Sequence, residues 1–272
     1  MQPAIWANDM QPFPAGQPRG AGASSVPQAV VLCGGLGTRL RNVVPVLPKA
    51  LAPVAGRPFL DYLLTGLAAA GIHDVVLCTG HKGEMIEAEY GRHAQCGLSI
   101  QYSVEDSPLG TAGAVKLAAR AISASSFLLL NGDSLVEVDY QRLLRGHVAS
   151  GAKATLTLVR APRPERYGTA VLSANGEISA FLEKAVSPDS ANSRNCFINA
   201  GVYALDRGIL LEIPSSSAPV SLERDVLPKL LGRGLFGFVS QGFFIDIGVP
   251  EDYARAQTEL PRRFGRASSH SC

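Results

Sequence analysis

Three glycines and two cationic residues gather in one short segment of the sequence. Gly34, Gly35 and Gly37 follow an apolar run, Arg39 comes next, and Lys49 follows a proline ten residues later. Glycines let the backbone curl so that its N–H groups point inward and bind an anion. The Arg39 guanidinium suits a pair of phosphate oxygens, and the Lys49 ammonium places a compact charge at a second phosphate. The segment therefore predicts a polyphosphate site.

Two common phosphate-binding templates do not fit this segment. The P-loop requires Gly-Lys-Ser/Thr at its end, which GGLGTRL lacks. The dinucleotide fingerprint GxGxxG, started at Gly35, requires a glycine where the sequence has Leu40. The first mismatch argues against a P-loop NTPase, and the second argues against a nicotinamide-dependent oxidoreductase.

Two aspartates end apolar runs further along the chain. Asp133 closes LLLNGD, and Asp246 lies in FFIDIG. A charged group at the end of a buried strand is costly unless it is paired or binds a metal. Two carboxylates on converging strand ends would supply part of the oxygen shell that Mg²⁺ accepts, with phosphate oxygens and water completing it. The alternative is that each carboxylate caps the next segment, Asp133 before Ser134 and Asp246 before Gly248.

The glycine segment and its flanks closely resemble a known signature. The stretch from Gly34 to Leu40, followed by Pro48-Lys49, is similar to the signature of the sugar-1-phosphate nucleotidyltransferases, also called nucleoside-diphosphate-sugar pyrophosphorylases. Later segments match the same family in the same order, from Gln28 to about Glu259. The resemblance implies an enzyme that condenses a nucleoside triphosphate with a sugar 1-phosphate and releases pyrophosphate.

The resemblance also implies roles for the charged residues. Arg39 and Lys49 would stabilise the triphosphate during in-line displacement at the α-phosphorus, where negative charge builds up. Asp133 and Asp246 match the aspartates that hold Mg²⁺. Lys184, in FLEK, would position the attacking phosphate. No general base is required, because a sugar phosphate oxygen is already ionised near pH 7.

The sugar side of the site is implied by three further segments. Glu183 of FLEK would accept hydrogen bonds from sugar hydroxyls, although a solvated Glu183–Lys184 pair at a strand exit is the alternative. Asn199 and Gly201 of NAGVY match sugar contacts, and an asparagine amide both donates and accepts. RYGTA matches another sugar-side segment, where packing is the competing interpretation. The residues of RYGTA that match the family's sugar-side positions are Tyr167 and Gly168.

The base pocket is implied by the first strand end and by VEDSPLGTAGAV. Glu105 matches the position that contacts the Watson–Crick edge of the base. An ionised carboxylate only accepts hydrogen bonds, so it suits the two adjacent donors of guanine and favours GTP over UTP or TTP. The alternative is that Glu105 is a polar residue before a turn. The nucleotide-binding set implied here is Leu32, Gly34, Gly35, Gly37, Thr38, Glu105, Gly110 and Thr111.

The identity of the sugar is carried by the resemblance alone. In its compactness and in FFIDIGVPEDYARAQ, the sequence is most similar to D-glycero-α-D-manno-heptose 1-phosphate guanylyltransferases, which implies GDP-heptose for capsule or other surface polysaccharide. Mannose 1-phosphate guanylyltransferases and uridylyl- or thymidylyltransferases of the family stay as alternatives. A non-catalytic regulatory subunit that binds a nucleotide sugar is an alternative of another class. No C-terminal β-helix is expected.

Alternating strand and helix patterns must position these residues. In the first half, short links between strands and helices predict a parallel sheet covered on both faces. Strands are expected at 28–33, 74–79, 98–105 and 126–133, and helices at 57–71, 82–91 and 110–121. We expect an α/β fold with a Rossmann-like, doubly wound, mixed and mainly parallel sheet. The glycine segment then lies at the carboxyl end of the first strand, where open sheets bind ligands.

The second half has a looser pattern. Helices are expected at 140–151, 221–231 and 250–260, and strands at 154–160, 196–205, 235–240 and 243–248. A hairpin over 168–184 should turn at Asn175-Gly176. Residues 28–260 are expected to form one domain. Residues 1–27 predict a disordered extension without a role, and residues 261–272 predict a polar tail.

Composition limits the partners. The 272 residues carry a net charge of only +2, which predicts neither nucleic acid nor an anionic membrane as a partner. No apolar run approaches the roughly 20 residues that cross a bilayer, and the start does not match a secretory signal. Five scattered cysteines without a CxxC pair favour a reducing cytoplasm, and Cys33 and Cys78 are expected to be buried. His81 is interpreted as an ordinary loop residue. The sequence leaves a homo-oligomer open.

Overall fold

The structure is a computed structural model that describes residues 27–35, 37–91, 93–94, 97–160, 166–183, 196–216 and 218–265. Leu36 and Lys184 lie outside the described residues, as do the first 26 residues of the expected N-terminal extension. Of Glu183 only the backbone is described.

Four parallel strands form the N-terminal half of a ten-stranded sheet, counted over these described ranges. In sheet order they are β7 (Ser126–Asn131), β1 (Gln28–Leu32), β4 (Asp74–Thr79) and β6 (Leu98–Val104). The short β5 (His93–Ala94) is added antiparallel to β6. The interiors of β1, β4 and β7 are apolar, as expected for strands that are buried on both faces, whereas β6 alternates between buried and exposed residues over its first half.

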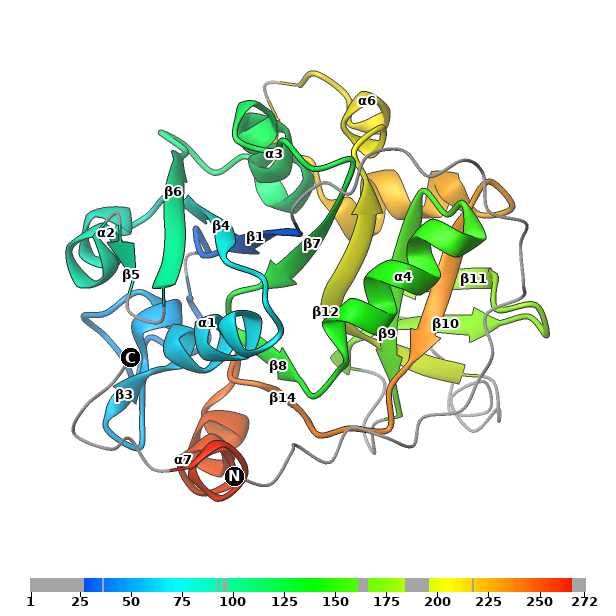
Figure 1. Ribbon diagram of the computed structural model, residues 1–272. Helices are drawn as coiled ribbons and strands as arrows, with labels where there is room; N and C mark the ends of the chain where they lie inside the picture. Colours follow the sequence, from blue (N-terminus) through cyan, green and yellow to red (C-terminus); the bar gives the residue numbers. More distant parts are fainter. Residues whose placement is uncertain are drawn as a thin grey trace.

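Helices cover both faces of this half (Figure 1). Apolar side chains of α1 (Phe59–Ala69), α2 (Gly83–Tyr90), α4 (Tyr140–Ser150) and α7 (Pro250–Phe264) belong to one core cluster, and those of α3 (Gly110–Leu117) belong to a second cluster. Residues of β1 alternate between the two clusters, with Val31 in the first and Val30 in the second. The predicted doubly wound α/β arrangement is confirmed.

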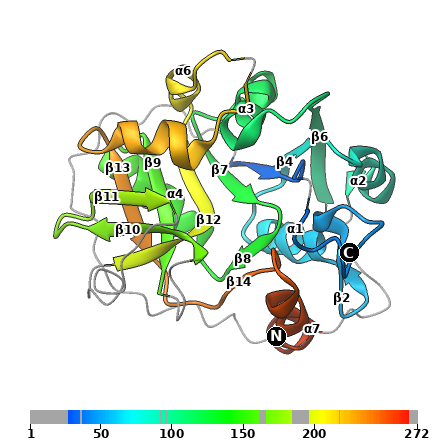
Figure 2. The same ribbon diagram turned by 180° about the vertical axis from the view of Figure 1, so that it is seen from behind.

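The C-terminal half of the sheet is largely antiparallel. Its long central strand is β12 (Cys196–Asp206), which pairs antiparallel with β7, with β9 (Ala154–Val159) and with β10 (Gly168–Leu172). β13 (Leu235–Val239) runs parallel to β9. β11 (Ile178–Glu183) forms the expected hairpin with β10, which closes through Ser173 N–H to the Glu177 carbonyl. Figure 2 shows this half from behind, beside the parallel half.

Two small two-stranded sheets lie outside the large one. β2 (Pro53–Val54) pairs with β3 (Arg57–Pro58), and β8 (Ser134–Val136) pairs antiparallel with β14 (Phe244–Asp246). In the second pair Asp246 lies opposite Ser134, the neighbour of Asp133. The Ile247 N–H also donates to the Asp133 carbonyl at 2.9 Å. This short sheet therefore carries the end of the chain back to the end of β7.

Some elements differ from the sequence-based expectation. The segment expected as a helix over 221–231 is a π-turn (Leu222–Val226) followed by a 3-10 turn (Leu227–Leu230). Pro228 has no N–H to continue a regular ladder. Helix α7 runs to Phe264, so the expected polar tail begins four residues too early. The pattern missed β2, β5, β8, a 3-10 turn at Lys49–Leu51 and α6 (Ile209–Glu212), each too short to show a period. The helix expected over 57–71 begins after β3, and the helix expected over 110–121 ends in a 3-10 turn at Ala118–Arg120.

The buried cysteines fit the expected interior positions. Cys33 and Cys78 are free thiols with 5% and 3% exposure. Burial raises the pKa of Cys78 to about 12, and the Glu105 charge contributes to the rise. Over the ranges that the structure describes, no helix combines the length and apolarity needed to span a membrane.

Candidate active site

Lys49 lies between the two aspartates. Its Nζ donates to Asp133 Oδ2 at 2.5 Å and lies 3.8 Å from Asp246 Oδ1. The three side chains come from the 3-10 turn after the glycine segment, from the end of β7 and from the end of β14. One ammonium within 4 Å of both carboxylates means that residues 84 and 197 positions along the chain from Lys49 converge at one point.

The convergence depends on the short β8–β14 pair. β7 ends at Asn131, Asp133 follows two residues later, and β8 comes next and pairs with β14. Gly132, between Asn131 and Asp133, lies close to the end of β1. A Cβ at this position would lie 2.7 Å from the Leu32 carbonyl oxygen. The close approach of β1 and β7 is therefore possible only with glycine at this position.

The two carboxylates have opposite pKa shifts. Burial raises the pKa of Asp133, but the Lys49 charge and hydrogen bonds from Lys49 and Ser134 outweigh it and leave that pKa lowered. Burial and the Asp133 charge raise the pKa of Asp246 to about 6, against the opposing effects of Lys49, Gly248 and Arg39. One ammonium neutralises one carboxylate, so the second carboxylate is short of positive charge.

The capping contacts that were the alternative interpretation are also present. The Ser134 hydroxyl donates to Asp133 Oδ1 at 3.1 Å, and the Gly248 N–H donates to Asp246 Oδ1 at 2.6 Å. A Cβ on Gly248 would lie 2.7 Å from Asp246 Oδ1 and 2.9 Å from Lys49 Nζ. The caps hold both carboxylates in place while they face Lys49, so the two interpretations are compatible.

A divalent cation fits this pair of carboxylates. Among the described residues no group of three or more His, Cys, Asp or Glu side chains is arranged to hold a metal. The pair of aspartates offers two hard oxygen donors with an excess of negative charge, which matches a Mg²⁺ ion that keeps several positions for phosphate oxygens and water.

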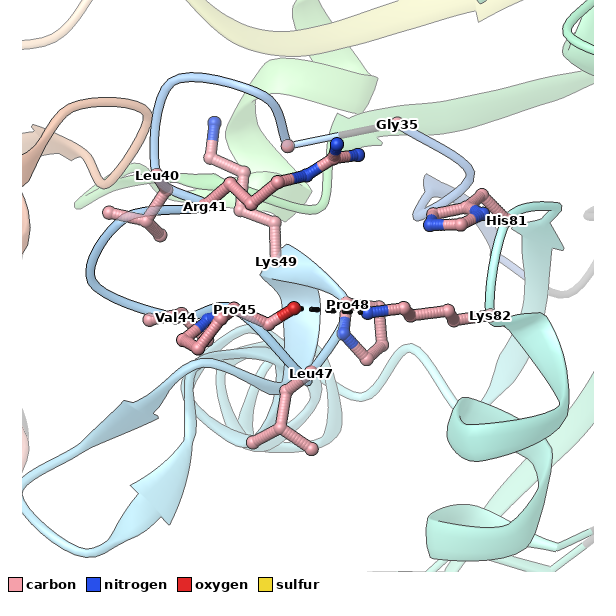
Figure 3. Close-up of a pocket in the computed structure, with 11 residues that line it drawn as sticks. Gly35, Leu40, Arg41, Val44, Pro45, Leu47, Pro48, Lys49, His81 and Lys82 are labelled. Carbon is pink, nitrogen blue, oxygen red and sulfur yellow. Dashed lines mark hydrogen bonds between the residues drawn. The ribbon is translucent and has the colours of Figure 1, made fainter.

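The glycine turn borders an open pocket (Figure 3). Gly35 and Gly37 line it together with Lys49, and Gly37 has φ +59°. Arg41 and Lys82 also line it (Figure 3). None of the lining residues is acidic. The pocket is therefore suited to a polyanion.

Arg39 and Thr38 lie on the exposed side of the same turn. Arg39 lowers the pKa of Asp246, so its guanidinium lies within electrostatic range of that carboxylate. Neither residue is among those that line the pocket. The basic residues Arg41 and Lys82 line it, and so does His81, which was interpreted from the sequence as an ordinary loop residue.

Glu105 lies against two glycines at the ends of β1 and β4. A Cβ on Gly34 would lie 2.6 Å from Glu105 Oε1, and one on Gly80 would lie 2.7 Å from the same oxygen. The Leu109 N–H donates to Glu105 Oε2 at 3.1 Å. Burial raises the pKa of Glu105, and the hydrogen bond from Leu109 opposes the rise. Leu32, at the end of β1, is half-buried. The structure thus brings Glu105 to the glycine turn, as the sequence predicts.

The start of α3 is fixed by a close backbone contact. Gly110 has φ +77°, and a Cβ there would lie 2.5 Å from the Val220 carbonyl oxygen. The Thr111 hydroxyl donates to Glu223 Oε2 at 2.9 Å and accepts from the Leu222 N–H at 2.7 Å. Both hydrogen-bonding roles of this hydroxyl are therefore used within the protein.

Glu223 connects the two halves of the site. The Tyr203 hydroxyl donates to Glu223 Oε1 at 3.1 Å and lies 2.7 Å from the donating amide nitrogen of Asn199. Asn199 Oδ1 accepts from the Gly201 N–H at 3.2 Å. Thr111, expected on the nucleotide side, and Asn199, expected on the sugar side, are thus the two ends of one hydrogen-bond chain. In the sequence, Glu223 lies within the segment expected as a helix over 221–231 and was not assigned to the site.

The remaining sugar-side residues lie around β10 and β12. The ladder between β12 and β9 is interrupted between Asn199 and Tyr203, and Gly201 has φ +74° with the Asn131 amide against it. The Tyr167 ring packs edge-on against the Phe244 ring, with 5.5 Å between the ring centres. Burial raises the pKa of Tyr167, and the Asp246 charge adds to the rise. Gly168 begins β10.

Arg166 is a further residue that the sequence reading missed. Its Nη2 pairs with Asp252 Oδ2 at 2.7 Å, and its guanidinium lies 5.6 Å from the ring centre of Tyr167. Asp252, on α7, is only 4% exposed. The pair ties the segment before β10 to α7, and no local pattern signalled it because the partners are 86 residues apart.

Comparison with known proteins identifies consistent relatives. A family profile described as nucleotidyl transferase matches residues 28–263. The D-glycero-alpha-D-manno-heptose 1-phosphate guanylyltransferase of Aneurinibacillus thermoaerophilus is 42% identical over 234 residues, which cover 86% of this chain and 98% of that protein. The mannose-1-phosphate guanylyltransferase of Mycobacterium tuberculosis is 40% identical over 237 residues, and the match spans only 64% of its length.

A solved structure shares the fold. HddC from Yersinia pseudotuberculosis, complexed with GMP-PN, superimposes with a TM-score of 0.73 at 31% identity, covering 86% of this chain and 99% of that chain. A putative glucose-1-phosphate thymidylyltransferase from Bacillus anthracis has a TM-score of 0.77, and at 23% identity it supports the fold alone.

Proposed function

The chain belongs to the nucleotidyl transferase family, and from that premise we propose that it transfers GMP from GTP to D-glycero-α-D-manno-heptose 1-phosphate. The products are GDP-heptose, a donor for surface polysaccharide, and pyrophosphate. The observation that carries the proposal is the 42% identity to a heptose 1-phosphate guanylyltransferase over 98% of that protein's length. The convergence of Lys49, Asp133 and Asp246 supports the chemistry.

Lys49 and Arg39 supply positive charge where negative charge develops. In an in-line displacement at the α-phosphorus, charge accumulates on the five-coordinate centre and on the departing pyrophosphate. Lys49 is held at the meeting point of β7 and β14 by its contact with Asp133. Arg39 is exposed beside the glycine turn, where its side chain is accessible to a triphosphate.

Asp133 and Asp246 would hold Mg²⁺. A bound Mg²⁺ supplies charge neutralisation at the phosphates and orientation of their oxygens. Each aspartate is kept in position by a capping hydrogen bond, from Ser134 and from Gly248. Asp246 must be ionised to serve as a ligand, and its raised pKa of about 6 leaves it largely ionised near pH 7.

Glu105 would read the base. Its carboxylate lies against Gly34 at the end of β1, with one oxygen bonded to the Leu109 N–H. A carboxylate here accepts from the two adjacent donors on the Watson–Crick edge of guanine, whereas the flanking carbonyls of uracil or thymine would be repelled. The ends of β1, β4 and β6 therefore form the nucleotide side of the proposed site.

The sugar phosphate would bind on the antiparallel side. Within the part of the chain that the structure describes, Asn199 keeps one N–H and one acceptor lone pair beyond those engaged by Tyr203 and Gly201, and these can serve a sugar hydroxyl. Tyr167 lies near Asp246, at the border between the two substrates. We assign Glu183 to sugar hydroxyls and Lys184 to the attacking phosphate because of the family resemblance.

A second substrate is favoured by a specific observation. The 40% identity to a mannose-1-phosphate guanylyltransferase makes mannose 1-phosphate the alternative acceptor, with the same nucleotide and the same charged residues. We also propose a cytoplasmic location, which the free buried thiols of Cys33 and Cys78 support.

Pyrophosphate release tests the proposal directly. Purified protein is incubated with Mg²⁺, each of the four nucleoside triphosphates in turn, and either heptose 1-phosphate or mannose 1-phosphate. We expect the highest kcat/KM with GTP and the heptose, and GDP-heptose as the product in mass spectrometry. Faster turnover with mannose 1-phosphate would show that mannose 1-phosphate, and not heptose 1-phosphate, is the preferred acceptor. Silence with every pair would favour a nucleotide-sugar-binding protein without activity.

A further inference from the structure

Lys82 holds an unusual backbone conformation at the edge of the pocket. It precedes α2 with φ +60° and ψ 27°, in the left-handed region. Among the described non-glycine residues, only Ala55 shares a positive φ. A side chain disfavours this conformation, which glycine would adopt without strain. A lysine at this point therefore calls for an explanation in the contacts of its side chain.

The Lys82 ammonium binds two backbone carbonyls of the segment between the glycine turn and Lys49. It donates to the Val46 carbonyl at 2.5 Å and, as Figure 3 shows, to the Pro45 carbonyl at 3.3 Å. We define the phosphate arm as residues 37–48, which connect the glycine turn to Lys49. In the part of the chain that the structure describes, Lys82 makes no ion pair within 4.0 Å of a carboxylate, so its charge serves the two carbonyls.

The phosphate arm packs on the core through the side chains of Val44 and Leu47, but polar anchors near these carbonyls are few among the described residues. Leu40 is buried at 2% exposure and holds the beginning of the arm, whereas Val43 and Val46 are 48% and 66% exposed. Pro45 and Pro48 have no N–H to donate. The outer part of the arm therefore depends on its carbonyls for polar contact with the rest of the protein.

The two carbonyls lie close in sequence to the residues that matter for chemistry. Val46 is three residues before Lys49, and Pro48 between them has extended torsions of φ −62° and ψ 150°. Arg41 lies on the same arm and lines the same pocket as Lys82. A displaced Val46 carbonyl would thus shift the pocket wall that carries Arg41 and leads to Lys49.

We propose that Lys82 is a positioning residue that ties the phosphate arm to α2 and so shapes the polyphosphate pocket. The proposal rests on the proposed nucleotidyl transfer for its kinetic consequence. Lys82 acts through the arm, so its loss should weaken binding of the nucleoside triphosphate more than it slows the chemical step. The sugar phosphate, bound on the antiparallel half of the sheet, should be unaffected.

The test compares three variants. Lys82→Met keeps the aliphatic stem and removes the donors, and Lys82→Arg keeps donors. Lys116→Met is the matched control, because the Lys116 ammonium also donates to a loop carbonyl, that of Ile213 at 2.5 Å, away from the site. Each is measured for amide hydrogen exchange over residues 41–47 and for KM of both substrates and kcat.

We expect Lys82→Met to speed exchange in the arm about tenfold and to raise the KM for GTP at least fivefold, on the order expected when a binding interaction is lost. kcat and the KM for the sugar phosphate should stay within about twofold. Lys82→Arg should keep most of the wild-type exchange rate and most of the wild-type KM for GTP. Lys116→Met should change neither.

Unchanged hydrogen exchange over residues 41–47 in Lys82→Met would show that the Lys82 contact does not hold the arm. Faster exchange with an unchanged KM for GTP would overturn the positioning role. If the wild-type protein releases no pyrophosphate with any nucleotide, the proposed function fails, while hydrogen exchange in the same samples still decides whether Lys82 holds the arm.

Discussion

At the scale of single residues, the ammonium of Lys49 faces two carboxylates and neutralises only one. Asp133 takes the short contact of 2.5 Å, and Asp246 stays at 3.8 Å with a raised pKa. We propose that this imbalance suits the pair to a divalent cation. Lys49 would then act on the phosphates, which is the role that the family signature implies.

Replacing Lys49 should abolish turnover without unfolding the protein. Lys49→Met removes a charge aimed at the reacting phosphorus, so kcat should fall by about a thousandfold, a typical loss for one electrostatic contact in a transition state. Lys153→Met is the matched control, because Lys153 makes a 2.5 Å ion pair with Glu212 elsewhere. Near-normal pyrophosphate release by Lys49→Met would remove Lys49 from the mechanism.

The raised pKa of Asp246 predicts a stability effect in metal-free protein. The native pKa of about 6 lies above the ordinary 3.8, so folding favours the protonated form. The contribution to stability is complete below about pH 4 and is lost as the pH rises through 6. Asp246→Asn removes this loss, so in chelator its Tm should exceed that of the wild type at pH 8.

The same comparison at pH 4.5 supplies the control. There Asp246 is mainly protonated in the native state, so the difference in Tm between Asp246→Asn and the wild type should shrink. A variant that is no more stable at pH 8, or equally stabilised at both pH values, would show that Asp246 carries no electrostatic penalty.

Residue types predicted much of the site, but not which side chains are engaged. The convergence of Asp133, Asp246 and Lys49 agrees with the expectation from strand ends. The sequence could not show that the Thr111 hydroxyl is consumed by Glu223 and Leu222, because those partners are more than 100 residues away. Lys82 was missed for a similar reason, since its partners are carbonyls that carry no side-chain signal.

At the scale of elements, short pieces position the site more than long ones do. β14 has three residues, yet its pairing with β8 brings Asp246 to Asp133. Long elements such as β4 and α4 were predictable from their apolar pattern. Elements of two to four residues have no period to detect, so β8 and β2 could be found only in the structure.

The packing of α4 on the sheet predicts a sensitivity to acid. His147 is 1% exposed, with Nδ1 3.0 Å from the Thr155 hydroxyl on β9. Burial lowers the pKa of His147 to about 4. A lowered pKa contributes stability above the ordinary value near 6.5, and this is lost as the pH falls towards 4. The loss amounts to about 3 kcal/mol in the free energy of unfolding.

His147→Leu tests this effect, because leucine does not titrate. Chemical denaturation at pH 7 and at pH 4.5 should show a smaller decrease in the free energy of unfolding for the variant than for the wild type. The change with pH is compared, so the altered packing of the variant at each single pH does not enter. An equal decrease in both proteins would contradict the assignment.

At the scale of the whole molecule, the two halves of the sheet carry the two sides of the proposed site. The parallel strands β1, β4 and β6 end at the glycine turn and Glu105, and the antiparallel strands around β12 carry Asn199 and Gly201. Strand β14, which pairs with β8, and helix α7 lie near the junction between the two halves (Figure 2). The alternating pattern predicted the first half well. The second half depends on strand pairings that no local pattern specifies.

The central claim is that Asp133 and Asp246 bind one metal ion beside Lys49. The most direct measurement is a crystal structure with Mn²⁺ and a non-hydrolysable GTP analogue, in which anomalous scattering locates the metal. We predict a single ion coordinated by carboxylate oxygens of both aspartates, with Lys49 turned towards the phosphates. An ion bound only by phosphates, or away from either aspartate, would contradict the account.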